Sequence, residues 1–139
     1  SNVTLCALST ATDISKYYSE WDCSGTASGC SWRGVVCTNN NVTEISLPSM
    51  GLNGTIPTEL GHLTYLTSLD LSSNRLSSSI PDEMSSLSGL KSLKLNNNAL
   101  SYWISGALGS MTSLEMINLE SNSLSSYIPT EIRSLTKLT

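Results

Sequence analysis

The residues of this 139-residue chain that are most able to do chemistry are its four cysteines, which all lie in its N-terminal quarter. They are Cys6, Cys23, Cys30 and Cys37. An even, clustered set in a chain of this size favours two disulfides formed in an oxidising compartment. Zinc is the competing interpretation, but the 16, 6 and 6 intervening residues contain no C-x2-C pair, and His62 is distant in the sequence. We therefore expect disulfides.

The single histidine and the acidic residues form no catalytic pattern. Catalysis needs a base beside a nucleophile, or paired carboxylates in a pocket with displaced pKa values. His62 falls at a variable turn position, and Asp82 and Glu83 are adjacent at the expected start of a helical turn. Glu115 and Glu120 lie five residues apart on a strand and turn and do not converge. We expect no enzyme and no catalytic residue.

Metal, cofactor, nucleic acid and membrane sites are also not expected. The sequence contains no D-x-[DN]-x-[DN]-G loop and no histidine cluster. Its formal charge is −4, and no Lys/Arg cluster would attract a nucleic acid or an anionic membrane. No apolar run approaches the roughly 20 residues that cross a bilayer. The N-terminus lacks the basic and apolar regions of a signal peptide.

A 24-residue repeat fills the chain after residue 41. Leu66, Leu90, Leu114 and Leu138 are each 24 residues apart, and the first three begin the pattern L-x-x-L-x-L-x-x-N-x-L. The repeat before them is degenerate, with Met50 at the asparagine position. We therefore divide the chain into an N-terminal region, 1–41, and repeats over 42–65, 66–89, 90–113 and 114–137, with a fifth starting at 138.

Each repeat predicts a short strand followed by a helical turn. The alternation in L-x-L has the period of a strand, and repeats that cannot bury their leucines alone must stack into an α/β solenoid. Asn74, Asn98 and Asn122 carry amides that can bond backbone groups where the chain leaves the strand. An Ile-Pro pair precedes an acid in three repeats, which indicates proline and a carboxylate in the first turn of a helix. The acids are Glu59, Glu83 and Glu131.

Three segments resemble the plant-type leucine-rich repeat family. Residues 52–61 and 76–83 resemble its L-(S/T)-G-x-I-P-x-x-L-G segment, and residues 30–37, CSWRGVVC, match the C-x-W-x-G-V-x-C signature of its N-terminal cap. The resemblance covers nearly the whole chain. It implies a right-handed leucine-rich repeat superhelix of about four rungs, with a parallel sheet on the concave face, a disulfide-bonded N-terminal cap and no C-terminal cap.

The resemblance also implies the cysteine pairing. In this family four cap cysteines pair in sequence order, which gives Cys6 with Cys23 and Cys30 with Cys37. Each bridge would contribute roughly 3 kcal/mol through loop entropy. The tryptophans of the cap are then expected to pack over the end of the first rung rather than to contact a ligand. They are Trp21 and Trp32.

The family implies extracellular recognition, because receptor-kinase ectodomains and inhibitors of cell-wall-degrading enzymes, the polygalacturonase-inhibitor type, carry such repeats. Algal and protist surface proteins have similar repeats. Three N-x-[ST] sequons, at Asn2, Asn41 and Asn53, agree with a glycosylated chain that is secreted or at the cell surface.

The concave face is the family's usual recognition surface. Its outward positions are expected in three columns, namely Glu44, Ser68, Ser92 and Met116, then Ser46, Asp70, Lys94 and Asn118, then Pro48, Ser72, Asn96 and Glu120. The columns are small and polar, contain no aromatic belt, and predict a contact between Asp70 and Lys94 of neighbouring rungs. Such a face offers few anchors for a partner.

The third rung departs from the family pattern. Tyr102 stands at the family's glycine position, and Ser105 at its proline. If a second, lateral strand follows each rung, its outward column is Thr55, Ser79, Trp103 and Tyr127. We then expect Trp103 and Tyr127 to stack and, with Tyr102, to form a contact surface. The alternative is that these aromatics only shield a widened turn.

The functional prediction is a non-enzymatic extracellular module that binds a protein, peptide or glycan through its concave or lateral face. The alternative is a structural surface-coat or filament subunit. Thr139 lies two residues into a fifth rung with no polar cap after it. The chain is then a fragment of a longer ectodomain or a shortened chain, or a neighbouring copy covers its open rung and propagates a fibre.

Overall fold

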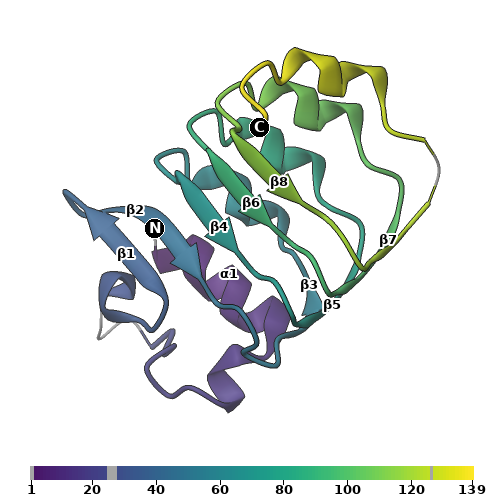
Figure 1. The fold of residues 1–139 in the computed structure, drawn as a ribbon. Coiled ribbons are helices and arrows are strands. Elements are labelled where there is room, and N and C mark those ends of the chain that lie inside the picture. Colours follow the sequence, from purple (N-terminus) through teal and green to yellow (C-terminus); the bar gives the residue numbers. More distant parts are fainter. Residues whose placement is uncertain (1, 25–27, 126) are drawn as a thin grey trace.

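Stacked coils form the repeat region, with strands on one side and short helices on the other (Figure 1). The computed structural model describes residues 2–24, 28–125 and 127–139. Helix α1 (Asn2–Thr12) lies across the N-terminal end of the stack (Figure 1). In the part of the chain that the structure describes, no helix has the length and apolar character needed to span a membrane.

Two sheets run along the stack. The first, which we call the concave sheet, contains in spatial order β1 (Val35–Thr38), β2 (Asn41–Ser46), β4 (Ser68–Asp70), β6 (Ser92–Lys94) and β8 (Met116–Asn118). The second, the lateral sheet, contains β3 (Asn53–Thr55), β5 (Arg75–Ser78), β7 (Ala99–Tyr102) and β9 (Ser123–Leu124). All pairs are parallel except β1 with β2, which are antiparallel.

The two sheets have different registers. In the concave sheet Leu69 pairs with Leu93, a shift of one full 24-residue repeat. In the lateral sheet Thr55 pairs with Ser77, and Ser101 with Ser123, so that partners are only 22 residues apart. The expected lateral strand is therefore present, but its ladder is two positions out of phase with the repeat.

Short 3₁₀ helices form the opposite side of the rungs. They are η3 (Thr58–His62), η4 (Asp82–Ser86), η5 (Gly106–Ser110) and η6 (Thr130–Ser134). The acids expected in first turns do lie there, but Pro57, Pro81 and Pro129 occupy the preceding N-cap position with extended backbone rather than the first helical position. At the third rung Ser105 replaces proline, and its hydroxyl accepts a hydrogen bond from the Ala107 N–H at 3.1 Å. Side-chain capping thus compensates for the missing proline.

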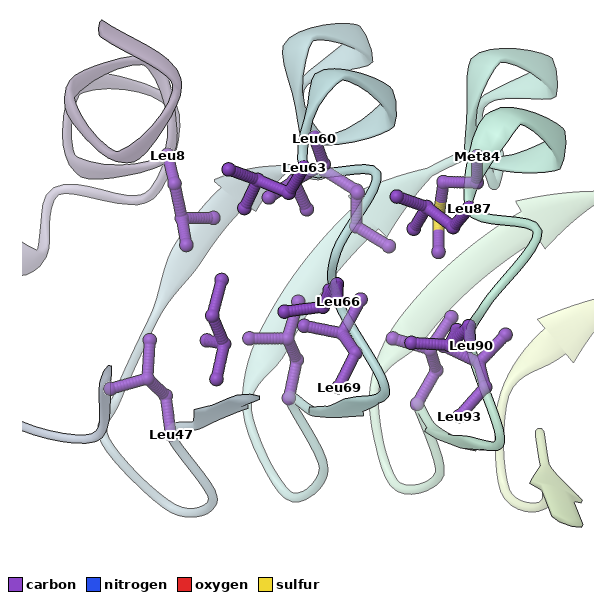
Figure 2. Packing of buried hydrophobic residues seen from close by; sticks show 14 of the residues in the cluster. Leu8, Leu47, Leu60, Leu63, Leu66, Leu69, Met84, Leu87, Leu90 and Leu93 are labelled. Carbon is purple, nitrogen blue, oxygen red and sulfur yellow. The ribbon is translucent and has the colours of Figure 1, made fainter. Parts of the chain in front are cut away.

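The leucines at the repeat positions form one continuous core. Figure 2 shows leucines from the concave strands facing leucines and methionine from the 3₁₀ side, with Leu8 of α1 packed at the end of the row. Leu69 and Leu93 are fully buried, and Ile117 in the last rung is half-buried against the same core. Each fully buried leucine contributes about 1.5–3 kcal/mol relative to an exposed one, so the stacking of rungs holds the fold together.

The asparagines bridge neighbouring rungs as the sequence predicted. Asn98 accepts a hydrogen bond from the Leu76 N–H of the preceding rung at 2.9 Å, and its amide nitrogen donates to the carbonyls of Leu71 and Leu95, each at 3.0 Å. Asn74 and Asn122 make the equivalent bonds. Backbone groups that the turn leaves without strand partners are thereby satisfied.

The N-terminal cap is closed by two disulfides, Cys6–Cys23 and Cys30–Cys37, as the family resemblance implied. It also contains η1 (Ile14–Lys16) and η2 (Gly29–Ser31). Trp21 and Trp32 are buried with ring centroids 5.0 Å apart, and the Trp21 indole N–H donates to the Arg33 carbonyl at 3.2 Å. The two tryptophans are packing anchors, as expected.

Arg33 ties the outer layer of the cap together. Its Nε donates to the Glu20 carboxylate at 3.2 Å, and its guanidinium lies 5.2 Å from the centre of the Tyr18 ring. The pKa of Glu20 lies below its usual value, chiefly because of a backbone hydrogen bond and then because of the bond from Arg33.

Candidate recognition surfaces

The outward columns of the concave sheet are aligned as the sequence predicted. Ser92 pairs with Met116, and Lys94 lies between Asp70 and Asn118. The Lys94 ammonium is 3.7 Å from the Asp70 carboxylate, which confirms the expected contact. The parallel register therefore brings the predicted concave residues together on one face. Their role in binding stays a prediction.

Much of the concave face is bonded to itself. The Asp70 carboxylate also accepts hydrogen bonds from the Ser72 N–H at 3.0 Å and from the Ser72 hydroxyl at 2.6 Å. A second pair between rungs, Lys91 with Glu115 at 3.6 Å, was not foreseen, although its 24-residue spacing could have indicated it. A partner that used these charges would have to replace existing contacts.

The large apolar side chains that could anchor a partner lie on the flank, beside the lateral sheet. Tyr102 is 54% exposed, Trp103 64% and Tyr127 82%. In the described part of the chain the ring that contacts Trp103 is Tyr102, edge to face at 6.1 Å, and not Tyr127. The expected Trp103–Tyr127 stack is wrong because the lateral ladder is shifted to 22 residues, which pairs Tyr102 with Leu124 and leaves both aromatics beyond the paired positions.

Tyr102 is held in a backbone conformation that suits glycine. Its φ is +69°, and Gly54 and Ser78, the equivalent residues of the two preceding rungs, also have positive φ. Left-handed backbone costs a non-glycine residue roughly 1–2 kcal/mol. The exposed Tyr102 ring buries too little surface to account for that cost through the core, so its placement favours a role at the surface.

Two hollows adjoin on the flank, and Trp103 lines both. The first, about 430 Å³, has Ser79, Asp82 and Glu83 among its other lining residues. The second, about 580 Å³, has Tyr127 and Glu131. We call this pair of hollows with its three aromatics the Trp103 flank. The acids had been interpreted from the sequence only as helix starters, since nothing in the repeat indicated that an exposed indole stands between them.

The remaining candidate residues are separated from one another. His62 is exposed at the end of η3. Within the described ranges, no three His, Cys, Asp or Glu side chains are grouped as they would be around a metal ion. Of the predicted sequons, Asn2 accepts a hydrogen bond from the Gly29 N–H at 3.0 Å, Asn41 is half-buried, and Asn53 is exposed on β3. Their glycosylation stays a prediction.

Family models match most of the repeat region. A leucine rich repeat model matches residues 40–100, and a second leucine rich repeat model matches residues 113–135. The solved ectodomain of BIR2 from Arabidopsis thaliana is similar, with a TM-score of 0.89 and 36% identity over 99% of this chain and 76% of that chain. The GASSHO1/SCHENGEN3 ectodomain from the same plant has a TM-score of 0.92 and 32% identity, over 99% of this chain and 17% of that one.

Curated receptor kinases match a shorter stretch. The leucine-rich repeat receptor protein kinase EMS1 of Arabidopsis thaliana is 46% identical over 48 residues, which are 34% of this chain and 4% of that protein. Across three such relatives the match spans 4% to 6% of the relative's length. The similarity therefore lies in the extracellular repeats, and the kinase domains lie outside the matched region.

Proposed function

Because this chain belongs to the plant-type leucine-rich repeat family of receptor-kinase ectodomains, we propose that it is a non-catalytic recognition module for an extracellular protein or peptide. It acts when secreted or displayed at the cell surface. Its relatives give general support: the similar GASSHO1/SCHENGEN3 ectodomain is in complex with CASPARIAN STRIP INTEGRITY FACTOR 2.

The observation that carries the proposal is the exposure of three aromatic side chains on the outside of a closed core. Tyr102, Trp103 and Tyr127 present large, rigid apolar area next to the hollows. Such residues are the usual anchors of protein interfaces. The concave sheet, whose columns are polar and partly paired internally, then contributes the rim of the contact.

A displayed peptide library selected on this chain tests the proposal. Peptides that bind the parent should bind the Trp103→Ala/Tyr127→Ala variant at least tenfold more weakly, since both anchors are removed. The matched control is Tyr17→Ala/Tyr65→Ala, which removes two tyrosines of similar exposure, 66% and 63%, away from the flank.

Two results would contradict this function. One is a set of selected peptides that bind the parent and the Trp103→Ala/Tyr127→Ala variant equally well. The other is a loss of binding in the control variant alone. A partner that proves to be a glycan would keep the recognition role of the Trp103 flank and change the class of ligand.

A further inference from the structure

The Trp103 flank carries negative charge that this chain does not neutralise. Asp82 and Glu83 line the first hollow and Glu131 the second, all three exposed, and no described residue lining either hollow is Lys or Arg. In the described part of the chain the ion-paired acids are others, namely Asp13, Glu20, Asp70 and Glu115. Uncompensated carboxylates on both sides of an exposed indole are complementary to a cation.

The groups that would meet this cation are positioned by their neighbours. The edge of the Tyr102 ring contacts the Trp103 indole. Gly106 leaves room for Glu131, because a Cβ at Gly106 would lie only 3.1 Å from the Glu131 carboxylate. The Thr130 hydroxyl also donates to that carboxylate at 3.4 Å. The flank is therefore prearranged for a ligand.

Resting on the recognition function proposed above, we infer that the Trp103 flank binds an extended, positively charged peptide segment. An Arg or Lys side chain of the segment lies over the face of Trp103, the aromatic ring best suited to bind a cation. Its charge, or that of a second basic residue, pairs with Asp82 and Glu83 on one side and with Glu131 on the other. Arg fits better than Lys because its planar guanidinium can both stack on the ring and bond a carboxylate with two N–H groups.

The rungs set the spacing of the basic residues. Glu83 and Glu131 lie two rungs apart, which at about 4.8 Å for each paired strand is roughly 10 Å. In the extended polyproline conformation, residues three apart point the same way at about 9 Å. The preferred segment is therefore basic-x-x-basic.

Nuclear magnetic resonance of the indole N–H groups locates the binding directly. Of the three tryptophans, Trp103 is 64% exposed, whereas Trp21 and Trp32 are 1% and 2% exposed. On titration with a capped Gly-Arg-Pro-Pro-Arg-Gly peptide, the Trp103 signal should shift and the other two should stay. The neutral peptide with glutamine in place of arginine should cause no shift. Raising the salt from about 20 to about 500 mM should weaken binding severalfold.

Charge removal provides the matched comparison. The Asp82→Asn/Glu83→Gln/Glu131→Gln variant should bind the arginine peptide about tenfold more weakly or worse. The control Glu44→Gln/Glu59→Gln/Glu120→Gln removes three acids that are also without ion pairs in the described structure, but lie outside both hollows. It should change the affinity less than about twofold. Unmoved Trp21 and Trp32 signals verify that each variant is folded.

The inference is overturned if the arginine peptide leaves the Trp103 signal unmoved, or if the two triple variants bind it equally. It is also overturned if a neutral oligosaccharide such as cellohexaose shifts Trp103 and the peptide does not. In that last case the recognition function of the flank stands. If instead library peptides bind without any dependence on Trp103 and Tyr127, the proposed function itself fails.

Discussion

Tyr102 shows at the scale of one residue how function and stability compete. Its left-handed backbone is shared with Gly54 and Ser78 at the equivalent positions of earlier rungs, so the turn imposes the conformation whatever residue is present. A glycine would adopt it without steric cost. The tyrosine instead supplies an exposed ring against Trp103.

We predict that Tyr102→Gly is more stable than Tyr102→Ala by about 1 kcal/mol, because both lose the ring and only glycine relieves the backbone. Urea unfolding measures the difference. At the neighbouring Ser101, which lies in β7 without a positive φ, the order should reverse, with alanine more stable by about 0.5–1 kcal/mol. The same order at both positions would contradict the assigned strain.

Individual site residues were only partly predictable from the sequence. Trp103 and Tyr127 were identified because they depart from the repeat, and both are exposed. Their stacking was not predictable, since it assumed that the lateral strand keeps the 24-residue register of the concave strand. Asp82 and Glu83 were correctly placed at a helix start, but the adjoining hollow depends on side chains of three rungs.

At the scale of the element, each asparagine joins two rungs through its amide. We predict that Asn98→Ala lowers the free energy of unfolding by about 2–4 kcal/mol, because the Leu76 N–H and the carbonyls of Leu71 and Leu95 lose their partner. The control is Asn96→Ala, two residues earlier, whose side chain makes no hydrogen bond in the described structure. It should change stability by less than about 0.5 kcal/mol. Equal effects in thermal unfolding would show that Asn98 bridges nothing.

The 3₁₀ helices approach each other closely at glycine. A Cβ on Gly61 would overlap the carbonyl oxygen of Glu83 in the next rung. Gly61→Ala should therefore destabilise the chain by about 1–3 kcal/mol. At Gly89 the nearest atoms to a Cβ are 3.8 Å and 3.9 Å away and φ is not positive, so Gly89→Ala should be neutral or slightly stabilising. Calorimetry that ranked the two variants the other way would refute this packing.

The strand order of the concave sheet was predictable because buried leucines fix its register. A slip by one residue would turn Leu69 and Leu93 to water. The lateral sheet has no such constraint from its outward residues. Its 22-residue register reflects the shorter path between equivalent points on neighbouring coils, which a period read from the sequence does not contain.

At the scale of the whole molecule, the cap and the rungs form one core. Leu5 and Leu8 of α1 are fully buried in the same cluster as the repeat leucines. The cysteine pairing in the cap followed from the family resemblance and not from the spacing, because four cysteines alone allow three pairings.

The oligomeric state separates the two functional hypotheses at this scale. A recognition module should sediment as a monomer near 14.9 kDa over a wide range of concentrations. A filament subunit would form concentration-dependent polymers, since one end of each copy would dock on the next. We expect the monomer, and polymers that persist at micromolar concentration would favour the structural role.

The most direct test of the whole account is the free energy of unfolding of two variants that lie ten residues apart in the same rung. The phase of the repeat should decide whether a large apolar side chain belongs to the core or to the recognition surface. Leu93→Ala should cost about 2–5 kcal/mol, and Trp103→Ala less than about 1 kcal/mol, because Leu93 is fully buried and Trp103 is 64% exposed. Comparable losses for the two variants, or a larger loss for Trp103→Ala, would contradict the account.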